Sequence, residues 1–152
     1  MSAPAGTVAP DFRGRDQHGQ EFTLSGLAEP VLLFFYPFAF TAVCASELQA
    51  LRERAADFGE AGVRVVAVSC DSTYALRVFA DSEGFTIPLV SDFWPHGAIA
   101  SAYGVFDPDR GCARRGSFLI DAERRIHWTT ESPMGEARDI EDHLRRAAEL
   151  VA

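Results

Sequence analysis

Three apolar runs stand out in the pattern of hydrophobic and polar positions. Residues 31–38 (VLLFFYPF) and 63–70 (VRVVAVSC) are almost continuously apolar, and residues 87–92 (IPLVSD) form a shorter run. Runs of this length are typical of strands that are buried on both faces of a sheet. They predict the parallel centre of a sheet, and Pro37 is expected to end the first strand because proline cannot donate to a strand ladder.

Between and after these runs, the apolar residues recur at helical spacing. Leu48, Leu51, Ala55 and Phe58 predict a helix over residues 44–58, which Gly59 and Gly62 stop. Further helices are predicted over residues 73–84, 95–104 and 137–152. In the last of these, the residues expected to face inward are Ile140, Leu144, Ala147, Ala148 and Val151.

The remaining segments complete a mixed sheet. The pattern over residues 11–27 predicts a hairpin with its turn at residues 16–20. Two further strands are predicted over residues 113–121 and 124–130, joined by a turn around Asp121. The order is a hairpin, then β-α-β-α-β-α, then β-β-α. This order predicts an α/β fold of one domain, residues 1–152, in which helices flank both faces of a mixed central sheet. It is the thioredoxin-like arrangement with an N-terminal β-hairpin added.

Composition narrows the possible functions. The net charge of −8 argues against nucleic acid or an anionic membrane as a partner. All 14 basic residues are arginine, which excludes a lysine Schiff base or a P-loop lysine. There is no signal-peptide pattern and no apolar run of membrane-spanning length, so a cytoplasmic protein is expected. The 3 cysteines are far apart and the 4 histidines share no ligand spacing, so neither a disulfide framework nor a metal site is expected.

Cys44 lies where an apolar, aromatic segment changes into the first predicted helix. Thr41 is a candidate N-cap, which puts Cys44 in the first turn. Unpaired backbone N–H groups and the helix dipole favour negative charge there, and the thiolate is the nucleophilic form of cysteine. Aromatic neighbours such as Phe38 and Phe40 would exclude water. An inert buried thiol also fits this local pattern.

The spacing Pro37-x-x-x-Thr41-x-x-Cys44 resembles the active-site signature of the peroxiredoxins. The resemblance continues along nearly the whole chain, in APDF (residues 9–12), PLVSD (88–92), AYGVF (102–106) and RGSFLID (115–121). In its details, the sequence is most similar to the short one-cysteine subgroup, the alkyl hydroperoxide reductase E type of actinobacteria.

The resemblance implies a thiol-dependent peroxidase for hydrogen peroxide, organic hydroperoxides or peroxynitrite, with Cys44 oxidised to a sulfenic acid. Neighbours on a strand point to opposite faces, so only one of Arg114 and Arg115 can reach Cys44. The resemblance of this strand to that of the family, aligned on Ser117 and Phe118, implies that Arg115 is the active-site arginine. With Thr41 it would hold the peroxide, while Pro37 shields the sulfur. Glu47 is expected to orient Arg115, although a solvated helix-face carboxylate is the alternative. The family often has a second arginine before the last helix; Arg138 is expected at the surface instead.

No cysteine occupies a position of a known resolving thiol, so a one-cysteine mechanism with an external thiol is expected. By resemblance, the reductant is mycothiol with mycoredoxin, or a thioredoxin-like protein, and no cofactor is needed. Cys70 is expected in the core. Cys112 is expected in a polar loop beside two arginines, whose charge can lower the pKa of its thiol. A resolving thiol or a glutathionylation site are alternatives there, and no redox role is the expectation. The alternatives are an atypical two-cysteine enzyme that uses Cys112 or Cys70, and a peroxide-sensing redox protein.

An oligomer is also expected. Peroxiredoxins of this kind form face-to-face dimers near the active site, and Phe38, Phe40, Phe93 and Trp94 are the aromatic residues available for such an interface. Ordinary loop packing of these side chains is the alternative. The sequence therefore predicts a homodimer or a higher oligomer.

Overall fold

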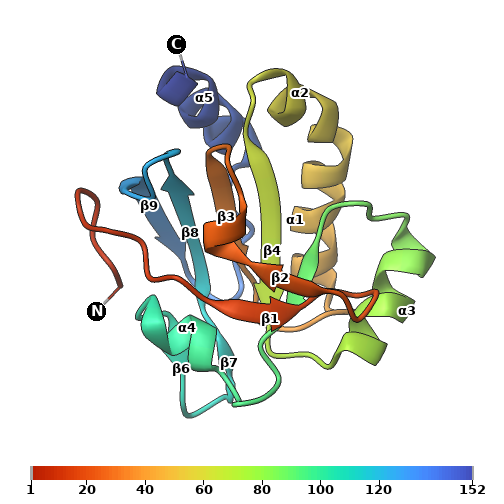
Figure 1. The fold of residues 1–152 in the computed structure, drawn as a ribbon. Helices are drawn as coiled ribbons and strands as arrows, with labels where there is room; N and C mark the ends of the chain where they lie inside the picture. Colours follow the sequence, from red (N-terminus) through yellow and green to blue (C-terminus); the bar gives the residue numbers. More distant parts are fainter. Residues whose placement is uncertain (1, 152) are drawn as a thin grey trace.

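A seven-stranded mixed sheet crosses the protein in the computed structural model, which describes residues 2–151 (Figure 1). The strand order is β2-β1-β5-β4-β3-β8-β9, and a separate two-stranded sheet contains β6 and β7. The strands are β1 (Arg13–Arg15), β2 (Glu21–Thr23), β3 (Val31–Phe35), β4 (Arg64–Ser69), β5 (Leu89–Ser91), β6 (Phe106–Asp107), β7 (Cys112–Ala113), β8 (Arg115–Ile120) and β9 (Ile126–Ser132). Strands β3, β4 and β5 are parallel, whereas β8 and β9 are antiparallel, which confirms the predicted mixed sheet.

The helices connect the strands in the predicted order. They are η1 (Leu24–Gly26), α1 (Ala42–Glu53), α2 (Ala55–Glu60), α3 (Thr73–Glu83), α4 (Ala98–Ala102) and α5 (Ile140–Val151). Gly84 ends α3 in the left-handed conformation (φ 71°), which glycine adopts without steric cost. None of these helices is long and apolar enough to cross a lipid bilayer.

Alternation along the central strands divides the core into two clusters. In β3, Leu32 and Phe34 face the cluster that includes residues of α1, α2, α3 and α5. Val31, Leu33 and Phe35 face the cluster that includes residues of α4 and of the N-terminal hairpin. Because successive strand side chains point to opposite faces, a continuous apolar run can supply both clusters. This confirms the prediction of helices on both faces.

Three details differ from the sequence prediction. The helix predicted over residues 44–58 starts at Ala42 and is interrupted at Arg54, which leaves the helical conformation (φ −104°, ψ 6°). Strands β6 and β7 were not predicted, because each is only two residues long. In α5, Ala148 and Val151 are exposed, and His143 occupies the inward position instead.

Candidate active site

Cys44 lies in the first turn of α1 and is completely buried. Thr41 occupies the N-cap position with extended backbone angles (φ −77°, ψ 148°), and its carbonyl accepts the amide of Ala45. The preceding residue, Phe40, has a φ of 71°, which is uncommon for a non-glycine residue and turns the chain sharply into the helix. The first amides of an α-helix have no partner inside the helix, and Cys44 belongs to this first turn.

Helical spacing brings Glu47 to the same face as Cys44. The buried residues of α1 are Cys44, Glu47, Leu48 and Leu51, which follow the i, i+3, i+4, i+7 pattern. The side chain of Glu47 is 0% exposed. This excludes the alternative of a solvated carboxylate, and a buried carboxylate requires partners that compensate its charge.

Arg115 provides one of these partners and also contacts the sulfur. Its Nη1 lies 3.2 Å from Cys44 Sγ and 2.6 Å from Glu47 Oε1, and its Nε donates to the carbonyl of Met134 at 2.8 Å. Arg114 points away and donates to the carbonyls of Gly104 and Phe106. Of the two adjacent arginines, it is therefore Arg115 that the structure brings to Cys44.

Arg138 is the second partner of Glu47, and the expectation that it lies at the surface is wrong. Its side chain is 2% exposed. Nε and Nη2 donate to Glu47 at 2.8 Å and 3.0 Å, and Nη1 donates to the carbonyl of Gly116 at 2.9 Å. The guanidinium also lies over the ring of Phe34, with Cζ 3.5 Å from the centroid. Arg138 can be buried because acceptors on α1 and β8 satisfy its N–H groups, and local sequence could not reveal acceptors so far away in the chain.

Glu47, Arg115 and Arg138 form a buried charge cluster. Burial alone would raise the pKa of the Glu47 carboxyl, but the hydrogen bonds and charge of Arg138, with the charge of Arg115, bring that pKa below its usual range. Burial lowers the pKa of Arg138, and Glu47 opposes this shift. One carboxylate between two guanidinium groups leaves one positive charge uncompensated. The guanidinium of Arg115 therefore presents positive charge to the sulfur of Cys44.

A pocket of about 250 Å³ opens next to this cluster. It is lined by Pro37, Phe38, Thr41, Ala42, Val43, Arg110, Cys112, Arg115 and Met134. The hydroxyl of Thr41 donates to the carbonyl of Phe38 at 3.1 Å and makes no hydrogen bond to the sulfur. Its oxygen lone pairs therefore remain available to a ligand. The pocket thus combines apolar walls with the Thr41 hydroxyl and the Arg115 guanidinium.

The other two cysteines are also buried, but no arginine donates a hydrogen bond to either thiol. Cys112 belongs to β7 rather than to a polar loop, because its pairing with Asp107 turns it inward. Burial and the charge of Asp107 raise the pKa of Cys112, against the opposing effect of Arg110, so the expected lowering is wrong. Burial raises the pKa of Cys70 to about 12.

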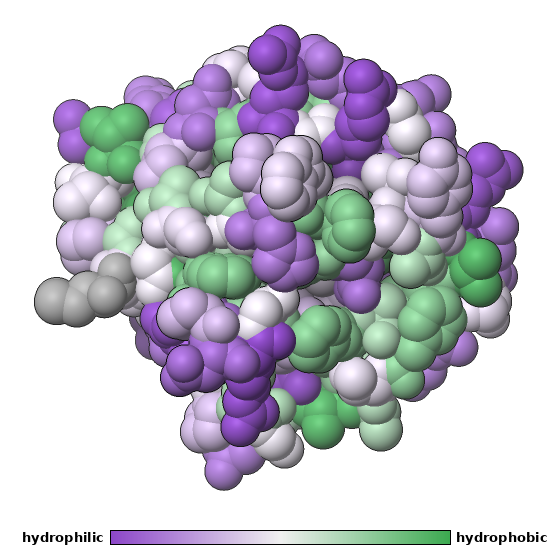
Figure 2. All heavy atoms as spheres, turned by 90° about the horizontal axis from the view of Figure 1, so that it is seen from below, coloured by the Kyte–Doolittle hydropathy of each residue, from purple (hydrophilic) through white to green (hydrophobic). Residues whose placement is uncertain are grey.

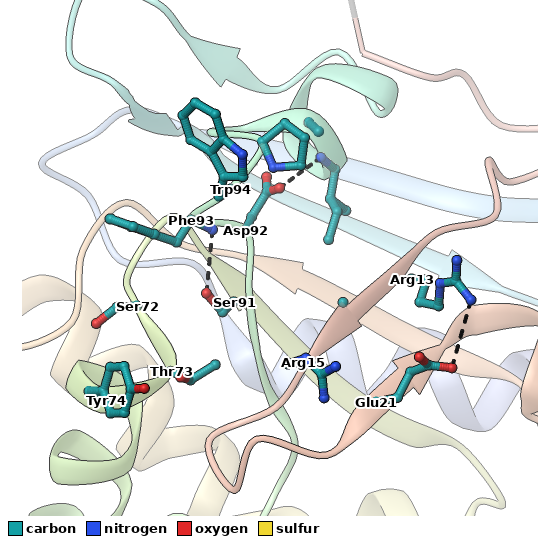
Figure 3. Close-up of a pocket in the computed structure, with 14 residues that line it drawn as sticks. Arg13, Arg15, Glu21, Ser72, Thr73, Tyr74, Ser91, Asp92, Phe93 and Trp94 are labelled. Carbon is teal, nitrogen blue, oxygen red and sulfur yellow. Dashed lines mark hydrogen bonds and ion pairs between the residues drawn. The ribbon is translucent and has the colours of Figure 1, made fainter.

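A larger cavity, about 830 Å³, lies apart from Cys44 (Figure 3). Its walls come from the β1–β2 hairpin, the start of α3 and the segment after β5. Figure 3 shows Arg13, Arg15 and Glu21 on one side, with Phe93 and Trp94 across from them. No residue of the charge cluster lines it. Within residues 2–151, no three His, Cys, Asp or Glu side chains gather as metal ligands would.

The fold and the site together define a thiol-based redox protein, and comparisons with known proteins agree. The AhpC/TSA family model matches residues 5–129. Alkyl hydroperoxide reductase E of Mycobacterium tuberculosis is 43% identical over 136 residues, which cover 88% of this chain and 89% of the relative. The 2-Cys peroxiredoxin BAS1 of Hordeum vulgare is 34% identical over 92% of this chain and 71% of its own length.

Solved structures give the same result. Peroxidoxin BcpB of Mycobacterium tuberculosis superposes with a TM-score of 0.85 at 31% identity, over 99% of this chain and 96% of the other. AhpC of Enterococcus faecalis superposes with a TM-score of 0.88 at 29% identity, over 98% and 92%. The chain belongs to the AhpC/TSA family of peroxiredoxins. It is a thiol-dependent peroxidase and thus an oxidoreductase.

Proposed function

We propose that Cys44 is the peroxide-reducing nucleophile of a one-cysteine enzyme. The observation that carries this proposal is the contact between Arg115 Nη1 and Cys44 Sγ at 3.2 Å, at the edge of a pocket that a peroxide can enter. A fixed cation at a buried sulfur stabilises the thiolate and needs no reorganisation when charge moves during the reaction.

The reaction balances with these residues. The Cys44 thiolate attacks the terminal oxygen of ROOH, the S–O bond forms and the O–O bond breaks, and the sulfur is oxidised to a sulfenic acid. The leaving RO⁻ takes a proton from solvent and departs as an alcohol or water. In this proposal, Arg115, the Thr41 oxygen and the first-turn amides of α1 hold the two peroxide oxygens, and the lining of the pocket by Thr41 and Arg115 supports it. Pro37, in the wall of the pocket, limits access of water to the sulfur.

The pocket supports a broad choice of peroxide. Its volume of about 250 Å³ and its apolar walls can accept an organic group as well as hydrogen peroxide. We therefore propose both hydrogen peroxide and organic hydroperoxides as substrates, with peroxynitrite as a further candidate. No prosthetic group is needed for this chemistry.

We propose that an external thiol reduces the sulfenic acid. Its sulfur displaces hydroxide from Cys44–SOH to form a mixed disulfide and water, and a second thiol then releases Cys44. Mycothiol with mycoredoxin, or a thioredoxin-like protein, fits this role, and a cytoplasmic location would supply it. Cys112 lines the same pocket, which favours the atypical two-cysteine mechanism as the second candidate. Its raised pKa argues against it, because a protonated thiol is a poor nucleophile.

Mass spectrometry of the intact protein distinguishes these mechanisms. After one equivalent of hydrogen peroxide, the one-cysteine mechanism predicts one added oxygen atom, or a thiol adduct, on Cys44. Loss of two hydrogen atoms without an adduct would identify an internal disulfide and contradict it. The same measurement on Cys112→Ser and Cys70→Ser variants would show which cysteine is the partner. A sensor would be oxidised but would not turn over peroxide with any thiol reductant.

We also propose a homodimer through exposed aromatic residues, one of which, Phe38, lines the pocket next to the charge cluster. Phe38, Phe40, Phe93 and Trp94 are 39%, 57%, 52% and 84% exposed, which is unusual for large hydrophobic residues. Figure 2 views the molecule from the lower end of Figure 1, where hydrophobic patches interrupt the hydrophilic surface. Light scattering after size exclusion should give twice the monomer mass, and Trp94→Ser should reduce it. A monomer in the unaltered protein would remove this proposal.

A further inference from the structure

The hydrogen-bonded cluster at Cys44 continues past Arg138 into the C-terminal helix. Arg138 Nη1 donates to Ser117 Oγ at 3.0 Å, and Ser117 Oγ lies 2.8 Å from His143 Nε2. Ser117 and His143 are 0% and 2% exposed. A connected series of buried polar groups therefore runs from α5, through β8 and the loop before α5, to the sulfur on α1.

The partner of His143 Nδ1 fixes the direction of these hydrogen bonds. Nδ1 lies 2.7 Å from the carbonyl oxygen of Asp139, which can only accept, so Nδ1 carries the ring hydrogen. Burial first, and then the charge of Arg138, lowers the pKa of His143, so the ring is neutral and Nε2 accepts. The Ser117 hydroxyl then donates to His143, and its lone pairs face Arg138.

The fold holds this connection rigidly. Arg115 and Ser117 lie two residues apart on β8 and so face the same side of the sheet. Ser117 is paired with Phe34 on β3, the residue whose ring lies under the guanidinium of Arg138. The ring of His143 packs edge-on against Phe34 and Trp128, with centroids 5.7 Å and 5.0 Å apart.

We propose that Ser117 and His143 are positioning residues of the peroxidase, a proposal that rests on the proposed role of Cys44. Glu47 Oε1 accepts from both Arg115 Nη1 and Arg138 Nη2. The two guanidinium groups compete for this carboxylate oxygen. When Arg138 is held firmly on Glu47, the carboxylate attracts Arg115 less strongly, and Arg115 stays close to the sulfur. Ser117, oriented by His143, anchors the opposite edge of Arg138 and so keeps Arg115 shared between Glu47 and Cys44.

The test removes the anchor at two places. Ser117→Ala and His143→Gln should each slow Cys44 oxidation by hydrogen peroxide roughly fivefold to tenfold, the size expected for one buried hydrogen bond. Each should also slow alkylation of Cys44 by iodoacetamide and move both rate–pH profiles to higher pH. Ser117→Thr, which keeps the hydroxyl, should retain the original profiles.

A matched control separates positioning from stability. Val66→Ala removes buried apolar atoms from the cluster on the other side of the sheet, so it should lower stability without changing either profile. If the Ser117 and His143 variants lose stability as Val66→Ala does but keep the original rates and profiles, the proposal is wrong. Should Ser117→Ala fail to fold, His143→Gln decides alone. Alkylation does not depend on peroxide chemistry, so failure of the proposed peroxidase role would be seen separately, as a Cys44 that alkylates normally but does not react with peroxide.

Discussion

The surroundings of Cys44 and those of Cys70 and Cys112 differ in charge, not in burial. Their exposed fractions are 0%, 4% and 0%. Only Cys44 has a guanidinium nitrogen within hydrogen-bond distance of its sulfur, among the contacts of residues 2–151. Burial without such a donor raises the pKa of the other two thiols. The contact with a buried guanidinium therefore distinguishes Cys44 from the other two buried thiols.

The buried guanidinium of Arg115 needs compensating groups from several parts of the fold. Arg115 cannot be buried beside Cys44 without an anion, and Glu47 provides it from the same helix as the sulfur. Arg138 then adds the charge that makes the cluster neutral when the thiolate forms. Near Cys112, by contrast, Arg110 is mostly exposed and its charge is screened by solvent.

Replacing the sulfur of Cys44 should have the largest effect on peroxide reduction among the variants that compare the three cysteines. Cys44→Ser is expected to abolish peroxide reduction, because a serine hydroxyl at this site cannot be oxidised to a sulfenic acid. Cys70→Ser and Cys112→Ser are the controls and should retain activity. The measurement is peroxide consumption with dithiothreitol as the reductant. Activity that survives in Cys44→Ser would place the nucleophile elsewhere.

The three cysteines should also differ in their rates of alkylation, which can be measured without any peroxide. With its pKa raised to about 12, Cys70 has almost no thiolate near neutral pH. Its alkylation by iodoacetamide near pH 8 should be roughly a thousandfold slower than that of a small free thiol. Peptide mapping after timed alkylation of the native protein measures each cysteine separately. Similar rates at Cys44 and Cys70 would contradict the distinction drawn from their surroundings.

Removing the guanidinium charge of Arg115 should make the surroundings of Cys44 more similar to those of Cys70 and Cys112. Arg115→Gln removes the charge and shortens the side chain, so that no donor reaches the sulfur. The oxidation rate should fall roughly 100-fold to 1000-fold, as for loss of one fixed donor in an active site. Stopped-flow fluorescence can follow the reaction. Arg114→Gln is the matched control, because Arg114 lies next in the chain and points away from the sulfur. An equal loss in both variants would mean that general destabilisation is the cause.

Much of this site could be predicted from the sequence because the relevant signals are local. The buried strand, the N-cap at Thr41 and Cys44 in the first turn all lie within one short segment. Strand alternation predicted that only one of Arg114 and Arg115 reaches Cys44, and the resemblance to the peroxiredoxins selected Arg115. The order of helices and strands was likewise set by periodicity, which is a local property.

The parts that were missed depend on contacts between distant segments. Arg138 is buried because Glu47, 91 residues away in the chain, accepts its hydrogen bonds. Cys112 is buried in the two-residue strand β7, where it pairs with Asp107 of β6. His143 replaces an apolar residue on the inward face of α5, since Ser117 and the Asp139 carbonyl satisfy its nitrogens. The sequence pattern alone predicts that polar residues lie at the surface, because it does not show the distant hydrogen-bond partners that allow them to be buried.

The smallest expected effect concerns stability, and it tests whether the buried cluster includes a neutral His143. The pKa of His143 is lowered from 6.5 in the folded protein, chiefly by burial and also by Arg138. The hydrogen bond to the Asp139 carbonyl opposes this shift, as do Asp142 and Glu47. As the pH falls below about 6.5, the unfolded chain binds a proton that the folded protein does not. The free energy of unfolding should therefore decrease on acidification, by at most about 1.4 kcal/mol per pH unit from this group.

Urea unfolding at several values between about pH 7 and about pH 5 measures this slope. His143→Gln should be less stable overall but should lose this part of the slope, because glutamine does not titrate. His18→Gln is the matched control variant, because it replaces a histidine that is exposed in the turn of the β1–β2 hairpin. If His143→Gln keeps the full slope, other groups cause it, and the neutral ring that accepts from Ser117 loses its support. A reduced slope in His143→Gln alone would show that the ring of His143 is neutral in the folded protein.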